Sequence, residues 1–217
     1  MKMLVVYEKM GPHRFIGHLD LQRAMQRALR RAGLPVRYSQ GFNPHLLLSF
    51  AAPLSVGVQG AREVMELPLA REMEEQAFLD RLNAALPEGL KALAARALEE
   101  ETPPAMARLQ AARYTLKPEE GLEALGQALP GFLAQASIPF EKRGKAGVRQ
   151  ADLRPLIHDL QLHGGALHAL LALSEQGSAR PDQLLASLCE YAGIPRPRCL
   201  ITRTALLDKR LLPLEQP

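Results

Sequence analysis

Apolar residues recur at helical spacing in one stretch near the start of the chain. Leu21, Met25 and Leu29 follow one another at intervals of four residues, which predicts an amphipathic helix over residues 19–32. Gly33 comes directly after this pattern and is expected to cap the helix at its C-terminal end.

Short apolar runs separated by turn residues fill the rest of the first hundred positions. Gly11-Pro12 ends the first run, and the GFNP sequence at 41–44 separates two later ones. The predicted strands cover residues 3–9, 36–39, 45–50 and 63–69, a second helix covers 71–85, and residues 90–98 fit either a strand or a helix.

The same order returns after residues 99–104, EEETPP, a charged stretch that ends in two prolines and predicts a linker. Gly164-Gly165 predicts a tight hairpin turn, whose register would place His163 and His168 as diagonal neighbours on one face. The predicted elements are a strand at 111–117, a helix at 121–135, a strand at 137–142 leading into a basic loop, a hairpin of 156–163 and 167–174, a helix at 181–191 and a strand at 199–207.

Both halves fit a split β-α-β arrangement. We therefore expect an α+β protein made of two tandem ferredoxin-like domains, each β-α-β-β-α-β with an antiparallel sheet. The expected domains cover residues 1–101, which form the basic N-terminal domain, and residues 102–217. No residue-level repeat relates the halves, so the predicted duplication concerns the pattern of elements only.

Composition indicates a soluble protein with a sizeable core. The 217 residues are 47% hydrophobic, mean hydropathy is −0.10, and no apolar run approaches the roughly 20 residues that span a bilayer. Cys189 and Cys199 are the only cysteines, which excludes a disulfide framework and a CxxC metal pair. We expect a protein of the reducing cytoplasm with no membrane partner.

Charge is unevenly distributed along the chain. The first 62 residues carry nine Lys and Arg against Glu8 and Asp20, a net charge of +7, whereas residues 63–101 carry a net charge of −6. This polarity indicates that the basic end meets an anionic partner.

Arginines line the polar side of the first predicted helix. Arg23, Arg27 and the Arg30-Arg31 pair are spaced by three and four residues, so they share the face opposite the leucines. Such a face can neutralise phosphates, since the planar guanidinium binds them bidentately. An ordinary solvated helix face, with the last two arginines favouring the helix dipole, is the competing interpretation.

A second basic cluster lies in the segment EKRGKAGVRQADLRP. Its glycines permit close approach of a ligand to the backbone, although the segment matches neither a Walker loop nor a dinucleotide fingerprint. A basic loop without a partner is the alternative. The cluster consists of Lys142, Arg143, Lys145, Arg149 and Arg154.

Three histidines, His13, His18 and His45, are close in sequence to Asp20 and Asn43. This set could perform acid–base chemistry, and His18, Asp20 and His45 are the catalytic candidates. The alternative is that His18 and Asp20 organise the helix N-terminus through hydrogen bonds. Because no HxH or HExxH spacing occurs, we expect no metal site and no bound iron, zinc or flavin.

The block HRFIGHLDLQRAMQRALRRAGLPVRYSQGFNPHLLLSFAAPLSVGV resembles the N-terminal signature of the bacterial radical-SAM-linked protein family, whose function is unassigned. The segment DLRPLI at 152–157 is similar to a second motif of that family. Gly17 stands where a serine is usual, and Leu46-Leu47 replaces a pair richer in proline and basic residues, which would alter any ligand contact there. The resemblance implies a stand-alone partner of a radical SAM enzyme in RNA modification or ribosome biogenesis. The chain itself has no CxxxCxxC cluster motif.

These observations together predict an RNA-binding accessory protein without a cofactor. RNA is preferred over duplex DNA because sheet faces and loops suit single strands and hairpins. Base stacking should be limited, since aromatics make up 5% of the chain. The alternatives are a protein-only adaptor that docks a radical SAM enzyme and a metal-independent RNA-processing enzyme. The expected RNA-binding residues are Arg14, Arg23, Arg27, Arg30, Arg31, Arg37, Ser39, Gly41, Phe42, Asn43 and His45, followed by Lys142, Arg143, Lys145, Arg149 and Arg154.

Overall fold

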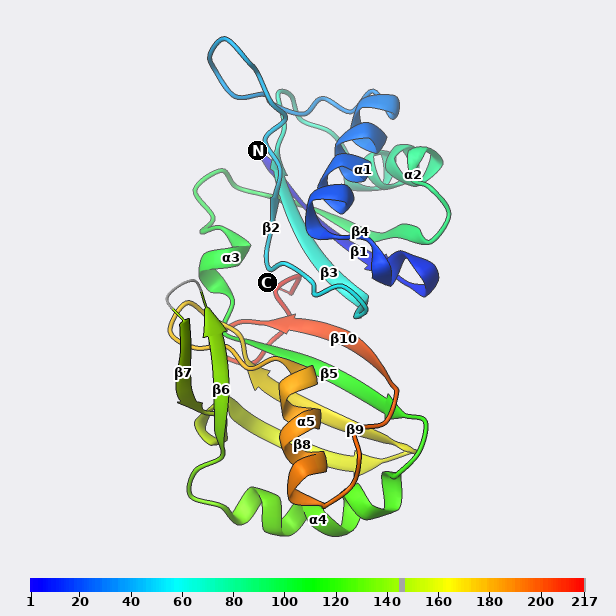
Figure 1. Ribbon diagram of the computed structural model, residues 1–217. Helices are drawn as coiled ribbons and strands as arrows, with labels where there is room; N and C mark the ends of the chain where they lie inside the picture. The colour runs from blue at the N-terminus through cyan, green and yellow to red at the C-terminus, as the bar shows by residue number, and fades with distance from the viewer. Residues whose placement is uncertain (145–146, 217) are drawn as a thin grey trace. The chain divides into compact units, whose positions relative to one another are not determined.

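The computed structural model describes residues 1–144 and 147–216 of the chain (Figure 1). Its strands are β1 (Lys2–Lys9), β2 (Ser49–Phe50), β3 (Gln59–Pro68), β4 (Leu90–Leu98), β5 (Ala111–Pro118), β6 (Pro139–Gly144), β7 (Gly147–Asp152), β8 (Ile157–His163), β9 (Ala166–Ala172) and β10 (Cys199–Leu207). Its helices are α1 (His18–Arg31), α2 (Glu75–Ala85), α3 (Ala105–Arg108), α4 (Leu122–Ala134) and α5 (Pro181–Tyr191), with short 3-10 turns η1 (Gly11–Phe15) and η2 (Arg154–Leu156).

The chain divides into two compact units, and the second is inserted in the sequence of the first. Unit 1 consists of Met1–Leu109 and Arg203–Pro217, and unit 2 consists of Gln110–Thr202. The sequence-based boundary between residues 101 and 102 therefore lies inside unit 1, and the last fifteen residues group with the first half of the chain.

Unit 1 combines an antiparallel sheet with two helices. Strand β1 pairs with β3 and β4, and β2 pairs with β3, all antiparallel, and β10 follows β3 in the strand order. Figure 1 shows α1 and α2 together on one face of these strands. The core between them contains, among other residues, Met3, Val5 and Tyr7 from β1, Met25 and Leu29 from α1, Met65 and Leu67 from β3, and Phe78 and Leu82 from α2.

Unit 2 holds the antiparallel strands β5, β9 and β8, in which β9 pairs with both β5 and β8. Strands β6 and β7 form a separate antiparallel hairpin. The β8–β9 register pairs His163 with Ala166 and Gln161 with His168, and the His163 and His168 rings stack with centroids 3.8 Å apart. The predicted turn register and the shared face of these two histidines are thus confirmed.

Several predicted elements differ from the structure. The strand predicted at 137–142 corresponds to β6, but the basic segment after it, predicted as a loop, contains a second strand, β7, which pairs with β6. Residues 90–98, which fitted either a strand or a helix, form strand β4. The strands predicted at 36–39 and 45–50 are reduced to two-residue β2 and the isolated bridges Val36–Leu69 and Tyr38–Leu46.

At the level of fold class, an α+β protein with mostly antiparallel strands is confirmed, whereas the tandem ferredoxin-like arrangement is not. None of the described helices is both long and apolar enough to cross a membrane.

Candidate nucleic-acid interface

The outer face of α1 carries the exposed arginines. Leu21, Met25, Ala28 and Leu29 are buried, which turns Arg23, Arg27 and Arg30 toward solvent. Arg23 Nη1 lies 3.2 Å from Asp20 Oδ1, and both side chains are about two-thirds exposed (66% and 65%). Within the described part of the chain, Arg27 and Arg30 have no hydrogen-bond or ion-pair partner. An exposed ion pair of this kind contributes little energy, so all three arginines remain available to an anion.

Arg31, by contrast, has an intramolecular role. Its Nη2 donates to the carbonyl of Ala85 (2.5 Å), which joins the C-terminal ends of α1 and α2. On the other side, Arg81 donates to the carbonyls of Ala32 and Gly33 at 2.6 and 2.7 Å. These two arginines satisfy helix-terminal carbonyls that would otherwise lack donors.

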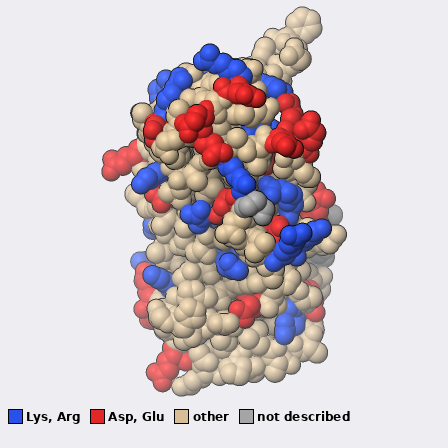
Figure 2. All heavy atoms as spheres, turned by 180° about the vertical axis from the view of Figure 1, so that it is seen from behind, with Lys and Arg blue, Asp and Glu red and all other residues tan. Residues whose placement is uncertain are grey.

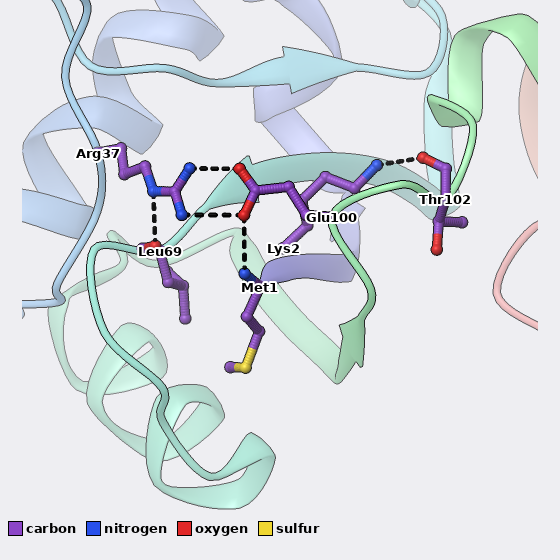
Figure 3. A network of polar contacts seen from close by, with 6 residues as sticks. All are labelled: Met1, Lys2, Arg37, Leu69, Glu100 and Thr102. Carbon is purple, nitrogen blue, oxygen red and sulfur yellow. Dashed lines mark hydrogen bonds and ion pairs between the residues drawn. The ribbon is translucent and has the colours of Figure 1, made fainter.

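Arg37, another residue that the sequence predicts to bind RNA, takes part in a polar network (Figure 3). Its guanidinium binds Glu100 bidentately, with Nη2 2.9 Å from Oε2, while Nε donates to the carbonyl of Leu69 (2.9 Å). The Met1 ammonium lies 3.1 Å from Glu100 Oε2, and Lys2 Nζ donates to the carbonyl of Thr102. Hydrogen bonds from Arg37 and Met1 lower the pKa of Glu100 to about 2. Glu100 and Thr102 belong to segment 99–104, which the sequence predicts as a linker, so the network attaches this segment to Met1, Lys2 and Arg37.

Between Tyr38 and Leu46 the chain forms a loop that projects from unit 1 (Figure 1). Three contacts close its base: the Ser39 N–H donates to the His45 carbonyl (2.8 Å), the His45 N–H donates to Ser39 Oγ (3.0 Å), and Ser39 Oγ lies 2.7 Å from His45 Nδ1. Tyr38 is 41% exposed, and Phe42, in the middle of the loop, is 106% exposed. Residues 38–46 include no charged side chain of Lys, Arg, Asp or Glu, and Figure 2 shows a tan projection in this region.

The catalytic candidates are engaged in separate contacts. The His18 ring packs edge-on against Phe50 with centroids 5.2 Å apart, Asp20 pairs with Arg23, and His45 binds Ser39. The His13 ring packs on Gly89, where an added Cβ would lie 2.2 Å from Nδ1. Across the residues that the structure describes, no group of three or more His, Cys, Asp and Glu could hold a metal ion.

The remaining predicted basic residues divide into two groups. Arg14 donates to the Gly11 carbonyl (3.3 Å) and stacks on the neighbouring Phe15 ring at 4.5 Å. Arg154 Nε donates to the Leu133 carbonyl (3.0 Å), so it satisfies a carbonyl near the end of α4. Lys142 and Arg149 are opposite one another in the β6–β7 hairpin. The side chains of Lys142, Arg143 and Arg149, and the whole of Lys145, lie outside the described residues.

Unit 1 contains a cluster of buried charged side chains, Lys9, Glu63 and Arg203, which was not predicted from the sequence. Arg203 Nε lies 2.9 Å from Glu63 Oε1, and the side chains are 2% and 1% exposed. The same guanidinium donates to the carbonyls of Ala52 and Pro53 at 3.1 and 3.2 Å. Lys9, 1% exposed, donates to the Ile16 carbonyl (3.0 Å).

These groups perturb one another and Tyr7. Burial lowers the pKa of Lys9, with Glu63 opposing that shift and Arg203 adding to it. Burial also raises the pKa of Tyr7 well above its usual value, an effect that Glu63 increases and Arg203 opposes. Lys9 directly follows Glu8, and Glu63 directly follows Arg62, so neither stands out from its neighbours as a charge that would be buried.

Comparison with known proteins gives a family but no activity. A search of curated proteins found no match. A solved structure of a heavy metal efflux pump, crystal form II, aligns with this chain at 10% identity and a TM-score of 0.26. The alignment covers 93% of this chain but only 28% of the pump chain. A similarity of that size supports no argument about fold or function. The family model described as "Uncharacterized protein conserved in bacteria" (DUF2344) matches residues 2–181, which include α1, the 38–46 loop and most of unit 2, and the chain belongs to this bacterial family.

Proposed function

We propose that this protein binds RNA through the outer face of α1 and the 38–46 loop. The observation that carries the proposal is the charge of this region: residues 21–62 contain six arginines and no carboxylate. Three of those arginines, Arg23, Arg27 and Arg30, are exposed along one helix face. A row of exposed guanidinium groups, of which only Arg23 has an ion-pair partner among the described residues, the exposed Asp20, suits a phosphate backbone because each contact releases a condensed counterion.

The biological setting is part of the proposal and has a different support. The resemblance of residues 13–58 to the radical-SAM-linked family motivates an accessory role beside a radical SAM enzyme, in RNA modification or ribosome biogenesis in the cytoplasm. The tandem ferredoxin-like arrangement also belongs here. It is supported by β4-β1-β3 with β2 beside β3 in unit 1, and by β10-β5-β9-β8 in the second half of the strand order.

Charge removal on α1 tests RNA binding directly. The variant Arg23→Gln/Arg27→Gln/Arg30→Gln should weaken binding to RNA of any sequence, and it should lower the slope of log K against log salt by about 2, at about 0.7 per lost phosphate contact. The matched control is Arg71→Gln/Lys91→Gln/Lys209→Gln, which removes three exposed cations of unit 1 outside α1. Fluorescence anisotropy with a labelled 20-nucleotide RNA across a salt series measures both.

The two variants must differ for the proposal to stand. We expect the control to bind within about twofold of the wild type with an unchanged salt slope. If the α1 variant binds as tightly as the wild type at low salt, or if both variants lose the same affinity, the α1 face is an ordinary solvated helix surface and RNA binding is rejected.

A protein adaptor is the second candidate, and one observation favours it. Phe15, Leu19 and Val56 are 60%, 64% and 62% exposed. The Gly57 N–H donates to the Arg14 carbonyl at 2.7 Å, which brings the segments that carry Phe15 and Val56 together. Copurification of a radical SAM enzyme that survives nuclease treatment and is lost in Leu19→Ser would favour the adaptor. Loss of the same complex on nuclease treatment would favour RNA.

A further inference from the structure

The base of the 38–46 loop is closed by contacts within the chain. Three contacts between Ser39 and His45 close its base. Outside them, the Leu47 N–H donates to the Arg37 carbonyl (3.0 Å), and Tyr38 bridges to Leu46. Gly41 adopts a φ of 122°, and an added Cβ would meet nothing within 4 Å, so glycine is required there for its backbone conformation rather than for space. A loop closed at its base loses less conformational freedom on binding than an open chain segment of the same length.

That outermost side chain is an aromatic ring in open solvent. Phe42 is 106% exposed, more than any other large hydrophobic residue of the described chain. Its neighbours Gln40, Asn43 and Pro44 are exposed and uncharged, so the tip offers a ring and two amides but no cation for a phosphate. The exposed cations Arg23, Arg27 and Arg30 lie on α1, which ends at Arg31, a few residues before the loop begins (Figure 1).

We propose that Phe42 is a stacking platform for an unpaired base, which makes the preferred ligand single-stranded RNA rather than a duplex. The inference rests on the proposed RNA binding and specifies its ligand. In a duplex both faces of every base are covered, so a ring at a loop tip can stack only on a base that has left the helix. Stacking tolerates any base, while the Asn43 and Gln40 amides can donate to and accept from base edges.

The test compares two substitutions of one exposed residue, neither of which threatens the core. Phe42→Leu keeps an apolar side chain but removes the ring, and Phe42→Tyr keeps the ring. Binding is measured to a 12-nucleotide adenosine-rich RNA carrying one 2-aminopurine, and to the same RNA annealed to its complement. We expect the wild type to prefer the single strand and to change 2-aminopurine fluorescence. Phe42→Leu should lose about 5- to 150-fold in single-strand affinity, the range of one stacked base, while Phe42→Tyr stays within about twofold.

The outcomes separate this inference from the function on which it rests. If the α1 arginine variant loses RNA binding but Phe42→Leu binds the single strand as the wild type does, RNA binding stands and the platform is refuted. Equal affinity of the wild type for single strand and duplex also refutes it. A loss of affinity in Phe42→Leu that changes the salt slope would indicate a disturbed phosphate contact and would count against stacking. If Phe42→Leu loses a protein partner while RNA binding is unchanged, the ring docks into protein.

Discussion

Replacing Arg203 by methionine should destabilise unit 1 by about 3 to 5 kcal/mol, the usual cost of removing one partner of a buried ion pair. The side chain of Glu63 is 1% exposed, so its carboxylate would lose its counterion without gaining water. The carbonyls of Ala52 and Pro53 would each lose a guanidinium donor as well. Lys9 is close enough for Glu63 to affect its pKa, so it would offset part of the loss.

The fit around Glu63 indicates why little relaxation can reduce this cost. A Cβ on Gly60 would lie 2.4 Å from Glu63 Cγ, so the backbone of β3 closes directly over the carboxylate side chain. A packed site of this kind admits no room for water to replace the guanidinium. The double variant Glu63→Met/Arg203→Met removes both charges, and we expect it to recover at least half of the lost stability.

Native-state hydrogen exchange of the β3 amides measures the effect within unit 1. The matched control is Arg62→Met on the same strand, whose partner Glu215 lies 2.8 Å away but whose own side chain is 46% exposed. That control should cost about 1 kcal/mol or less. The reasoning is wrong if Arg203→Met and Arg62→Met have the same effect, or if the double variant is no more stable than Arg203→Met.

Two further predictions follow from perturbed pKa values. The pKa of Glu100 is lowered from 4.5 to about 2, so its contribution to stability is complete above pH 4.5 and disappears as the pH falls through about 2. In urea unfolding, Glu100→Gln should be less stable than the wild type at pH 7 and equal to it below pH 2. A difference in stability that persists at pH 1.5 would contradict this. Partial burial raises the pKa of Cys199 to about 11, and burial also raises that of Cys189, so both thiols should react slowly with iodoacetamide at pH 8 and rapidly after unfolding in urea. Equal rates in the two states would argue against the raised pKa values.

The elements that could be predicted from the sequence are those whose apolar pattern fixes one buried face. The α5 helix and β10 have the predicted bounds, and α1 differs by one residue at each end. Strand β6 was predicted in part, but β7 and its pairing with β6 were missed because that segment is rich in charge and glycine and carries no period-two apolar signal. The strands around the GFNP turn were overestimated, since most of that segment is a projecting loop stabilised by the Ser39–His45 contacts.

The candidate site was predictable in part for a similar reason. The polar face of α1 follows from helical periodicity, so the exposure of Arg23, Arg27 and Arg30 could be foreseen. The engagement of Arg37 by Glu100 could not, because it depends on a contact between residues 63 positions apart. The same holds for Glu63 and Arg203, whose pairing across 140 positions leaves no trace in any local pattern.

The insertion of unit 2 between the two parts of unit 1 has a consequence for synthesis on the ribosome. At a translation rate of about 5 to 20 residues per second, the 140 positions that separate Glu63 from Arg203 take roughly 7 to 28 s to produce. Throughout that interval β3 lacks both its neighbour β10 and the guanidinium that neutralises its carboxylate. The first half of the nascent chain therefore exposes the β3 edge to pairing with other strands until β10 has been made.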